Sequence, residues 1–452
     1  MTPTEELILR YAAKPVPRYT SYPTAPHFHA GIDGARYADW LAALPDQACL
    51  SLYLHVPFCD TLCWFCGCHT KITQQYAPIA SYLRALTAEI ASVAAHLPAS
   101  ARVRHLHWGG GSPTILSPAD MRALGTALKE CFAFAADAEF AVEVDPRGLD
   151  DARIAALAEI GLSRVSIGVQ DFDPGVQALI NRRQSFEETA RVVAAFRAIG
   201  VGSLNIDAIY GLPDQHERQL IATLCQVVAL DPDRVALFGY AHVPWMKTHQ
   251  RLIPEERLPG LVERHAQAEA AADFLVGAGY RRIGIDHFAK ASDGLAVAAA
   301  SGRLQRNFQG YTVDPADALI GLGASAIGRL AQGYVQNETA IGQYRRRVEA
   351  GELATARGIA LSADDRLRGH AIERLMCDLA FSEAALRHRF GSLAEVLRAP
   401  AAAIIAEDRD GLVTPTEDGF LVSERGRPFL RSIAARFDAY IAAPAARHSA
   451  AV

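Results

Sequence analysis

The chain carries the sequence SLYLHVPFCDTLCWFCGC at residues 51–68, in which an apolar run leads directly into four cysteines. The apolar run at 51–57 predicts a buried β-strand. The cysteines follow as Cys59-x3-Cys63-x2-Cys66-x-Cys68. Because they stand immediately after a strand, we expect them to lie on a loop at its end and to form the centre of the chain's chemistry.

The spacing of these thiols favours an iron-sulfur cluster over the alternatives. Cys59, Cys63 and Cys66 can reach three corners of one [4Fe-4S] cubane, which leaves the fourth iron exchangeable. A structural zinc site usually takes two C-x2-C pairs, and no second pair follows downstream. Disulfides are not expected, since the chain is long and shows no apolar signal peptide. Cys68 stands too near Cys66 for both to bind one cubane, and we interpret it as a nearby free thiol.

The composition limits the number of domains and the class of protein, but it does not indicate an activity. The 452 residues, 50% of them hydrophobic, suffice for one large domain with an attachment or for two to three domains. The formal charge of −5 gives no general attraction to nucleic acid or to an anionic membrane. The sequence contains no stretch of about eighteen apolar residues, which is the length that would predict a membrane span, so we expect a cytoplasmic enzyme. The remaining cysteines are interpreted as small buried hydrophobes, at Cys49, Cys131, Cys225 and Cys377.

After the cysteine loop, strand-like runs alternate with amphipathic helical stretches, which is typical of parallel strands joined by crossover helices. We predict strands at residues 52–55, 103–108, 139–144, 164–168, 203–209 and 234–240. We predict helices at residues 79–94, 118–131, 150–160, 186–199 and 217–229. Six strands fall short of the eight of a closed barrel. We therefore predict an α/β fold with an incomplete, laterally open (βα)6-type TIM barrel, with an open doubly wound sheet as the alternative.

Either architecture places ligands at the carboxyl ends of the strands, and the informative residues stand there. In chain order they are the four cysteines, segment 109–114, Glu143–Pro146, segment 170–172, Asp207 and segment 241–242. Their shared position at strand ends strengthens the case for each of them.

Two flanks lie outside this repeat. Residues 1–45 contain RYTSYPTA at 18–25, which is bounded by prolines and too polar for a core, and we predict an arm that covers the active site. We assign residues 46–340 to the barrel and adjoining elements and 341–452 to a mainly helical C-terminal domain. Its predicted helices and its turn-rich pair are similar to a winged helix, with helices at 367–379, 383–388, 393–398 and 426–442 and the pair at 411–414 and 419–422. No run of Lys and Arg marks a face for DNA, so we expect no nucleic acid partner.

An exchangeable iron can bind a chelating amine and carboxylate, and S-adenosylmethionine (SAM) offers both. The glycines at 109–111 would not block such a ligand, and their amides can bind its methionyl end. Alone, they would indicate a tight turn. Glu143 and Asp207 can accept hydrogen bonds from ribose hydroxyls or an ammonium group, although a helix cap or a buried ion pair would explain either one. Gln170 and Arg182 could bind polar ligand groups, and Arg182 could equally be solvated.

These motifs together resemble the radical SAM superfamily, since Tyr53-x-His55-x-Pro57 precedes the cysteines and the glycine run follows them. Within it, the chain closely resembles the oxygen-independent coproporphyrinogen III oxidases over nearly its whole length. The segments that carry the resemblance are 18–24, Cys68, 107–111, 143–146, 168–172, 205–207, 210–213, 240–242, 286–289 and 307–311.

The resemblance implies one [4Fe-4S] cluster with three cysteine ligands and two SAM molecules, the first of them on the exchangeable iron. The residues that resemble the first SAM pocket are Tyr53, Gly110, Glu143 and Ile327. Those that resemble the second are Phe65, Gly111, Ser112, Gln170, Arg182, Asp207 and Ala241. Phe308 and Gln309 match a loop close to the cofactors and, with Tyr53, are the candidate catalytic residues. Arg18 and Tyr22 lie on the segment that resembles a substrate lid.

The implied activity is the anaerobic oxidative decarboxylation of two propionates of coproporphyrinogen III to vinyl groups, which gives protoporphyrinogen IX in haem biosynthesis. An external one-electron donor of the flavodoxin or ferredoxin type reduces the cluster, SAM is consumed, and a 5′-deoxyadenosyl radical abstracts hydrogen from each propionate. The family also implies a monomer.

Two other functions stay open. One is a haem chaperone on the same scaffold, which usually lacks segment 18–24 and the Cys66-Gly67-Cys68 arrangement. The other is a regulatory protein that uses the cluster as a sensor, for which the winged-helix-like module is the sole hint.

Overall fold

Six parallel strands in sequential order form the centre of the computed structural model, which describes residues 2–12 and 15–441. They are β1 (Cys49–Val56), β4 (Arg102–Gly110), β5 (Phe134–Val144), β6 (Arg164–Gln170), β7 (Ser203–Tyr210) and β8 (Arg234–Gly239). The order of these six never reverses, whereas a doubly wound sheet reverses at a switch point. All six predicted strands are confirmed, and the doubly wound alternative is excluded.

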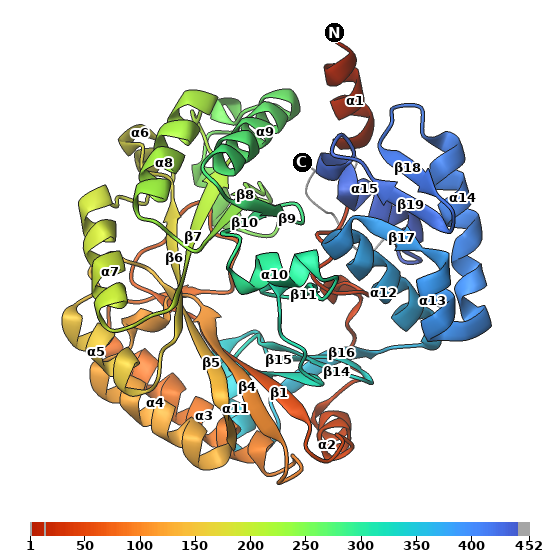
Figure 1. Cartoon of the computed structure of the whole chain (residues 1–452). Coiled ribbons are helices and arrows are strands. Elements are labelled where there is room, and N and C mark those ends of the chain that lie inside the picture. The colour runs from red at the N-terminus through yellow and green to blue at the C-terminus, as the bar shows by residue number, and fades with distance from the viewer. Residues whose placement is uncertain (1, 13–14, 442–452) are drawn as a thin grey trace.

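The crossover helices lie along the outer side of the curved sheet (Figure 1). They are α3 (Tyr76–Ala94), α4 (Pro118–Cys131), α5 (Asp151–Glu159), α6 (Pro174–Leu179), α7 (Phe186–Ala198) and α8 (Glu217–Ala229). Side chains cap several of their N-termini, as Ser117 does by accepting from the Asp120 amide. The predicted helices 118–131 and 217–229 match α4 and α8 residue for residue. Within the described part of the chain, no helix is both long and apolar enough to cross a membrane.

The sheet extends beyond the six predicted strands at both edges and does not close. Next to β1 follow β13 (Ala318–Leu322), β14 (Ile327–Leu330), β15 (Gly333–Asn337) and β16 (Thr355–Ala360), and next to β8 follow β10 (His287–Ala289) and β9 (Arg281–Ile283). Of these additions only β13 runs parallel to its neighbour β1. The twelve-stranded sheet ends at β16 and β9, which confirms the laterally open barrel.

A buried carboxyl group fastens the β13–β15 extension to the barrel. Glu89 on α3 is only 2% exposed and accepts hydrogen bonds from the Gly323 amide, Asn337 Nδ2 and the Tyr344 hydroxyl at 2.6–2.7 Å. Tyr344 belongs to α11 (Ile341–Glu349). Burial raises the pKa of Glu89 to about 7, although these three donors act in the opposite direction.

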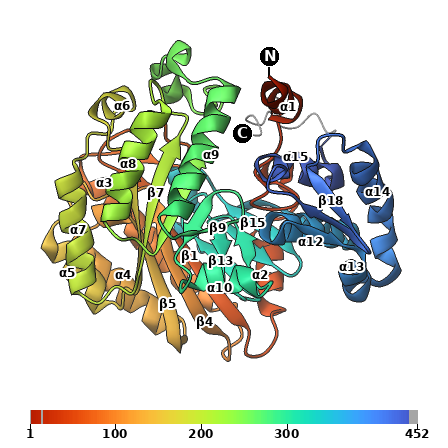
Figure 2. The ribbon, with the colours of Figure 1, turned by 45° about the horizontal axis from the view of Figure 1, so that its top comes forward.

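The sheet continues past the expected boundary at residue 340, because β16 pairs with β15 through Tyr334 and Ile359. The following elements form a second body beside the barrel in both views (Figures 1 and 2). They are α12 (Ala363–Asp378), β17 (Ala380–Ser382), α13 (Glu383–Phe390), α14 (Arg398–Glu407), β18 (Val413–Thr416) and β19 (Gly419–Val422). The three strands pair in the order β17-β19-β18, which gives the winged-helix-like arrangement that we expected.

Two helices of this second body differ from prediction. Residues 393–398 were expected to form an α-helix, but a 3₁₀-helix covers Gly391–Leu397 and leads into α14. The predicted helix at 426–442 is divided into a 3₁₀ turn (Arg427–Phe429), α15 (Leu430–Ala434) and a second 3₁₀ turn (Ala435–Phe437). Asp438 then adopts an extended conformation, and residue 442 lies outside the described residues.

The N-terminal segment is anchored to both bodies. Helix α1 (Pro3–Ala12) packs Leu7 and Ile8 into the C-terminal core, and the Tyr11 ring lies 5.6 Å from that of Phe429. Helix α2 (Gly34–Ala42) instead buries Trp40 in the barrel's core. The expected arm over residues 1–45 therefore contains two packed helices, while residues 1, 13 and 14 lie outside the described residues.

The titration of Glu89 should make the stability of the barrel depend on pH. Its pKa is raised in the folded state, so the folded chain binds more protons than the unfolded chain between about pH 4.5 and pH 7, and the unfolding free energy falls as pH rises through this window. The Glu89→Gln variant lacks this titration. Between about pH 4 and pH 8 the wild type should lose on the order of 3 kcal/mol more stability than the variant.

Urea unfolding at a series of pH values measures this difference. The amide group introduced by Glu89→Gln would face hydrogen-bond donors and costs stability at every pH, so the test is the slope of stability against pH. Parallel slopes for the two proteins would show that Glu89 titrates normally.

Candidate active site

The four cysteines lie on a loop that closes upon itself directly after β1. Cys59 ends β2 (Phe58–Cys59), which pairs in parallel with β3 (Lys71–Ile72), and the Thr73 amide donates to the Cys59 carbonyl at 2.9 Å. The middle of the loop is tied to the segment after α6, because the Trp64 amide donates to the Ile180 carbonyl at 2.9 Å. These bonds hold the thiols at the carboxyl edge of the sheet.

One cavity of about 190 Å³ gathers most of the residues that the sequence singled out. Strand register aligns its walls, since Val56 pairs with Gly110 and Asp207 pairs with Gly168. The expected residues that line it are Cys59, Cys63, Cys66, Phe65, Gly110, Gly111, Ser112, Glu143, Gln170, Arg182 and Asp207.

The remaining expected residues lie outside the walls of this cavity. Tyr53 lies deeper in the barrel, where its hydroxyl is 3.1 Å from His55 Nδ1. Ile327 and Phe308 pack against a separate apolar cluster around Tyr334. Arg18, Phe308 and Gln309 line a second pocket, Tyr22 joins the C-terminal core, and the Ala241 carbonyl accepts from Gln250 Nε2 at 3.2 Å.

The glycine run provides space rather than free amides. A Cβ atom on Gly111 would lie 2.5 Å from the Phe58 carbonyl oxygen, and one on Gly110 would lie 2.5 Å from the His55 ring. Gly110 also has φ of +108°, a conformation that favours glycine. We expected these amides to bind a ligand, but those of Gly110, Gly111 and Ser112 already donate to Glu143, Val56 and Phe58.

Glu143 is poised as an ionised acceptor. Its carboxylate accepts from His107 Nε2 and from the Gly110 amide, both at 3.0 Å. Burial opposes ionisation, but these two partners outweigh it and hold the pKa of Glu143 below its usual value. The carboxylate can therefore accept hydrogen bonds from an ammonium or hydroxyl group of a ligand.

Asp207 on β7 also has hydrogen-bond partners, but it ionises less readily than Glu143. Its two oxygens accept from Ser166 Oγ at 3.0 Å and from Asn205 Nδ2 at 2.7 Å. Burial and the charge of Glu143 raise the pKa of Asp207 to about 6, against the effect of these hydrogen bonds. Two neighbouring carboxyl groups with different pKa values can bind different ligand groups.

Gln170 reaches the cavity through an irregular strand end. The pairing of β6 with β7 shifts register between Gly168 and Gln170, and Gln170 itself has φ of +69°. Such a bulge redirects a side chain at the rim of a sheet.

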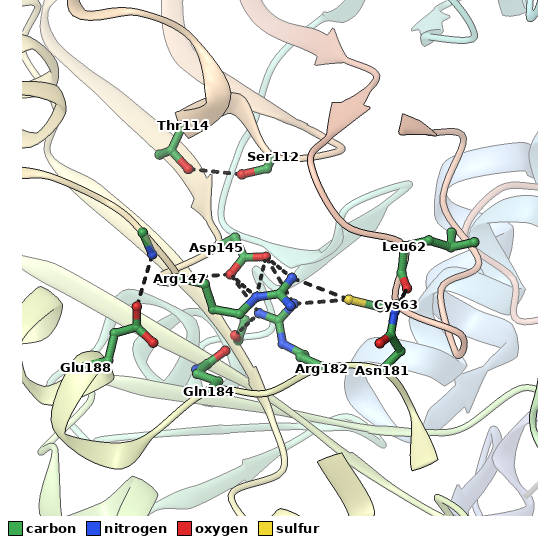
Figure 3. Close-up of polar contacts among 12 residues, drawn as sticks. Leu62, Cys63, Ser112, Thr114, Asp145, Arg147, Asn181, Arg182, Gln184 and Glu188 are labelled. Carbon is green, nitrogen blue, oxygen red and sulfur yellow. Dashed lines mark hydrogen bonds and ion pairs between the residues drawn. The ribbon is translucent and has the colours of Figure 1, made fainter. Parts of the chain in front are cut away.

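A network of two arginines and one aspartate contacts the thiol of Cys63 (Figure 3). Asp145 accepts from Arg147 at 2.6 Å and from Arg182 at 3.1 Å, and each guanidinium also lies 3.5 Å from Cys63 Sγ. Burial would raise the pKa of Asp145, but the two arginines hold it below its usual value. The thiol of Cys63 therefore lies beside two guanidinium groups that share one carboxylate.

Sequence reasoning assigned no role to Asp145 or Arg147. Their position in the sequence could have identified them as site residues, because Asp145 follows Glu143 by two residues at the end of a predicted strand. It also left open whether Arg182 is solvated, and its side chain is only 6% exposed.

Cys68 lines the same cavity, although it was expected to be only a nearby thiol. Its amide donates to Cys66 Sγ at 3.4 Å, and the hydrogen bond from the Cys68 side chain contributes most to lowering the pKa of Cys66. His249 and Lys247 fix the backbone here by bonding the carbonyls of Cys66 and Cys68 at 2.8 Å.

The described residues contain no group of three or more His, Cys, Asp or Glu side chains that converge on a single metal ion. The four cysteines of the loop line one cavity of about 190 Å³. Three thiols around one cavity, with two arginines beside one of them, fit an iron-sulfur cubane.

Comparisons with known proteins agree with this geometry. A family model described as the radical SAM superfamily matches residues 53–224. The oxygen-independent coproporphyrinogen III oxidase of Paracoccus denitrificans (strain Pd 1222) is 48% identical, over 97% of this chain and 96% of the relative. An anaerobic coproporphyrinogen III oxidase of Cereibacter sphaeroides is also 48% identical, over 96% of each chain. The solved structure of coproporphyrinogen III oxidase from Escherichia coli, described as a radical SAM enzyme, has a TM-score of 0.90 at 39% identity and covers 94% of this chain and 98% of its own.

Substitution of Gly111 tests whether the glycine run is required by space. In Gly111→Ala the new Cβ would meet backbone atoms of Phe58, which cannot move without displacing the cysteine loop. We expect a loss of about 1–3 kcal/mol, as for other overpacked sites, measured as a shift of the urea unfolding midpoint.

Gly67→Ala is the matched control, because Gly67 lies between two of the cysteines and a Cβ there has no atom within 4 Å. The control should change stability by less than about 0.5 kcal/mol. Equal effects of the two substitutions would contradict the steric argument.

Proposed function

This chain belongs to the family of oxygen-independent coproporphyrinogen III oxidases within the radical SAM superfamily, and we propose that it converts coproporphyrinogen III to protoporphyrinogen IX by oxidative decarboxylation of two propionates to vinyl groups. It is a radical SAM oxidoreductase that uses a [4Fe-4S] cluster and SAM. The observation that carries this function is the cavity in which three thiols of the Cys59-x3-Cys63-x2-Cys66 motif face Glu143 and Asp207.

The cluster would be held by Cys59, Cys63 and Cys66, with the fourth iron exchangeable. These thiols share one cavity, and the guanidinium groups of Arg147 and Arg182 lie 3.5 Å from Cys63 Sγ, where they can orient it as a ligand. When bound and reduced, the cluster would supply one electron for the cleavage of SAM, and SAM would supply the radical chemistry that removes hydrogen from a propionate β-carbon. The protein residues orient the reactants and exclude water.

Two SAM molecules are proposed, with residues divided between them as the family resemblance implies. For the first we assign Tyr53, Gly110, Glu143 and Ile327. For the second we assign Phe65, Gly111, Ser112, Gln170, Arg182, Asp207 and Ala241. The ionised carboxylate of Glu143 and the shared cavity support most of these residues, whereas Tyr53, Ile327 and Ala241 rest on the resemblance alone.

Phe308 and Gln309 would act at the interface between cofactor and substrate, with Tyr53 as a further candidate. Gln309 supports this role because it lines both the pocket next to Arg18 and the cavity inside the barrel that Glu143 and Asp207 also line. Arg18 itself donates to the Gly239 carbonyl at 3.0 Å, which brings the N-terminal segment to the end of β8. This contact supports the role of that segment as a substrate lid, to which we also assign Tyr22.

An external donor of the flavodoxin or ferredoxin type would deliver the electrons. Lys71 and Ile72 on β3 are exposed beside Cys59, so a redox partner can approach the cluster from this side. We further propose a monomer that acts in the cytoplasm. The eight cysteines are free thiols in the structure, which suits a reducing compartment.

The anaerobic reaction tests the function directly. Protein reconstituted with iron and sulfide should release methionine and form protoporphyrinogen, detected as protoporphyrin fluorescence after oxidation, when reductant, SAM and coproporphyrinogen III are added. Methionine without protoporphyrin would identify a different substrate. An intact cluster that yields neither product would favour a haem-binding or sensing role.

Serine substitutions test the proposed ligand set. Replacing Cys59, Cys63 or Cys66 should abolish the visible absorbance of the reconstituted cluster, whereas Cys68→Ser should retain it. Cys225→Ser is the control, because Cys225, which we expected to be buried, is an exposed thiol on α8. Loss of absorbance in Cys68→Ser, or its retention in any of the first three variants, would show that the ligand set is wrong.

A further inference from the structure

A second pocket of about 240 Å³ lies at the end of β8, where the N-terminal segment and the C-terminal body meet the barrel. It contains an unusual concentration of positive charge. Five guanidinium groups from separate parts of the chain line it, and we call it the arginine pocket: Arg18 before α2, Arg264 on α9 (Leu261–Gly277), Arg282 on β9, Arg306 on β11 (Gln305–Asn307) and Arg431 on α15.

Acidic side chains are fewer than arginines in the wall of the arginine pocket, where the two carboxyl groups belong to Glu269 and Asp286. Asp286 stays ionised, since its hydrogen bond with His287 Nδ1 at 2.7 Å and the nearby arginines hold its pKa at about 2 against burial. The other acidic residue of the wall, Glu269, is paired with Arg282 at 3.0 Å. Asp286 is therefore the carboxylate that remains beside Arg18, Arg264 and Arg306, and its Oδ2 atom lies 4.0 Å from Arg306 Nη2.

Several buried donors of the arginine pocket have no acceptor among the described residues. Arg306 is held by the ring of Tyr311 at 4.6 Å and by a 3.4 Å bond to the Arg18 carbonyl, yet its Nε and Nη1 atoms are without partners. Arg264 donates to the Tyr240 carbonyl at 2.7 Å, and its Nε atom is also without a partner. Buried donors of this kind are costly unless a ligand supplies acceptors.

The neighbouring positive charges affect the pKa values of arginines in this pocket. Burial, together with the positive charges of Arg18 and Arg306, lowers the pKa of Arg431 to about 10. Burial and Arg18 likewise lower the pKa of Arg264. A bound anion would relieve this repulsion.

The arginine pocket adjoins the active-site cavity through the barrel interior. Phe238 and Gln309 line both the arginine pocket and the cavity inside the barrel. That inner cavity in turn shares Glu143, Ser166 and Asp207 with the cavity that the cysteines line, which we call the cysteine cavity. Aromatic side chains complete its wall, at Tyr210, Phe238, Tyr240 and Phe308. A large ring system with several carboxylates matches this combination of aromatic surface and guanidinium groups.

We propose that the arginine pocket binds the carboxylates of the two propionates that coproporphyrinogen III retains, while a reacting propionate reaches toward the cysteine cavity. This inference rests on the proposed function and specifies how the same substrate is held. The four propionates of the substrate divide into two that are converted and two that persist, and the persistent pair needs cationic partners when it is buried. Arg264 and Arg306 act here as binding residues, through the donors that the protein leaves without acceptors.

The test measures binding of coproporphyrin III, which carries four carboxylates, and of its uncharged tetramethyl ester to the reconstituted enzyme by fluorescence quenching. The unsubstituted enzyme should bind the acid at least tenfold more tightly than the ester. Arg306→Gln and Arg264→Gln should each raise the Kd of the acid at least tenfold, leave that of the ester within about twofold, and raise KM for coproporphyrinogen III more than they lower kcat. Arg306→Lys, which keeps the charge, should recover part of the affinity.

Arg122→Gln is the matched control, since Arg122 pairs with Glu159 on the outer helices and its side chain is 43% exposed. It should leave the Kd and KM unchanged. Equal affinity of the unsubstituted enzyme for acid and ester would overturn the proposal without any variant, so it stays testable if a glutamine variant fails to fold. Unchanged KM and Kd in both folded glutamine variants would also overturn it.

Failure of this inference is distinct from failure of the proposed function. Normal protoporphyrin formation with unchanged Kd in the arginine variants would overturn the arginine pocket and leave the activity intact. Arginine-dependent binding of coproporphyrin III by an enzyme that forms no protoporphyrin would support the pocket and overturn the oxidative decarboxylation.

Discussion

The register of the six parallel strands is the constraint on which the candidate site depends. Backbone pairing sets Val56 beside Gly110 and Gly168 beside Asp207, so residues far apart in sequence meet at one edge of the sheet. A shift of one residue in β5 or β7 would turn Glu143 or Asp207 to the other face. The space between strands is equally fixed, because a side chain at Gly111 would collide with the backbone of the cysteine loop.

Charge within this frame is arranged around the thiols. Asp145 alone could not stay ionised in its buried position, and Arg147 and Arg182 make this possible by bonding it from two sides. The same two arginines contact Cys63 Sγ, so one structural ion network also positions a thiol that we propose as a cluster ligand. Breaking a buried network of this kind leaves an uncompensated charge, which typically costs about 3–5 kcal/mol. The stability of the strand ends and the chemistry of the cluster site are therefore linked through Asp145.

The sequence predicted features that depend on local pattern, and it failed where distant segments decide the outcome. Helix α4 has its Ser117 cap and periodic apolar face within its own residues, and its bounds were predicted without error. Strands β13 to β16 are short and are stabilised by pairing and by Glu89, which lies 234 residues before its partner Gly323 in the chain. The packing of α1 into the C-terminal core is likewise non-local. In the site, residue types and strand ends indicated the cavity correctly, whereas the engagement of the glycine amides and the role of Arg147 required coordinates.

The chain contains two groups of buried arginines, and their charge balance distinguishes their tasks. Arg147 and Arg182 both contact the carboxylate of Asp145 and the thiol of Cys63, so their anionic partner lies within the protein. The arginine pocket has five guanidinium groups and two carboxylates, one of them paired with Arg282, and in our proposal the substrate supplies acceptors for Arg264 and Arg306. The retained propionates are the same in substrate and product, so this pocket stabilises both equally and cannot by itself favour release of the product. Discrimination between substrate and product must then arise at the other end of the barrel interior, where the reacting carboxylate is present before the reaction and absent after it.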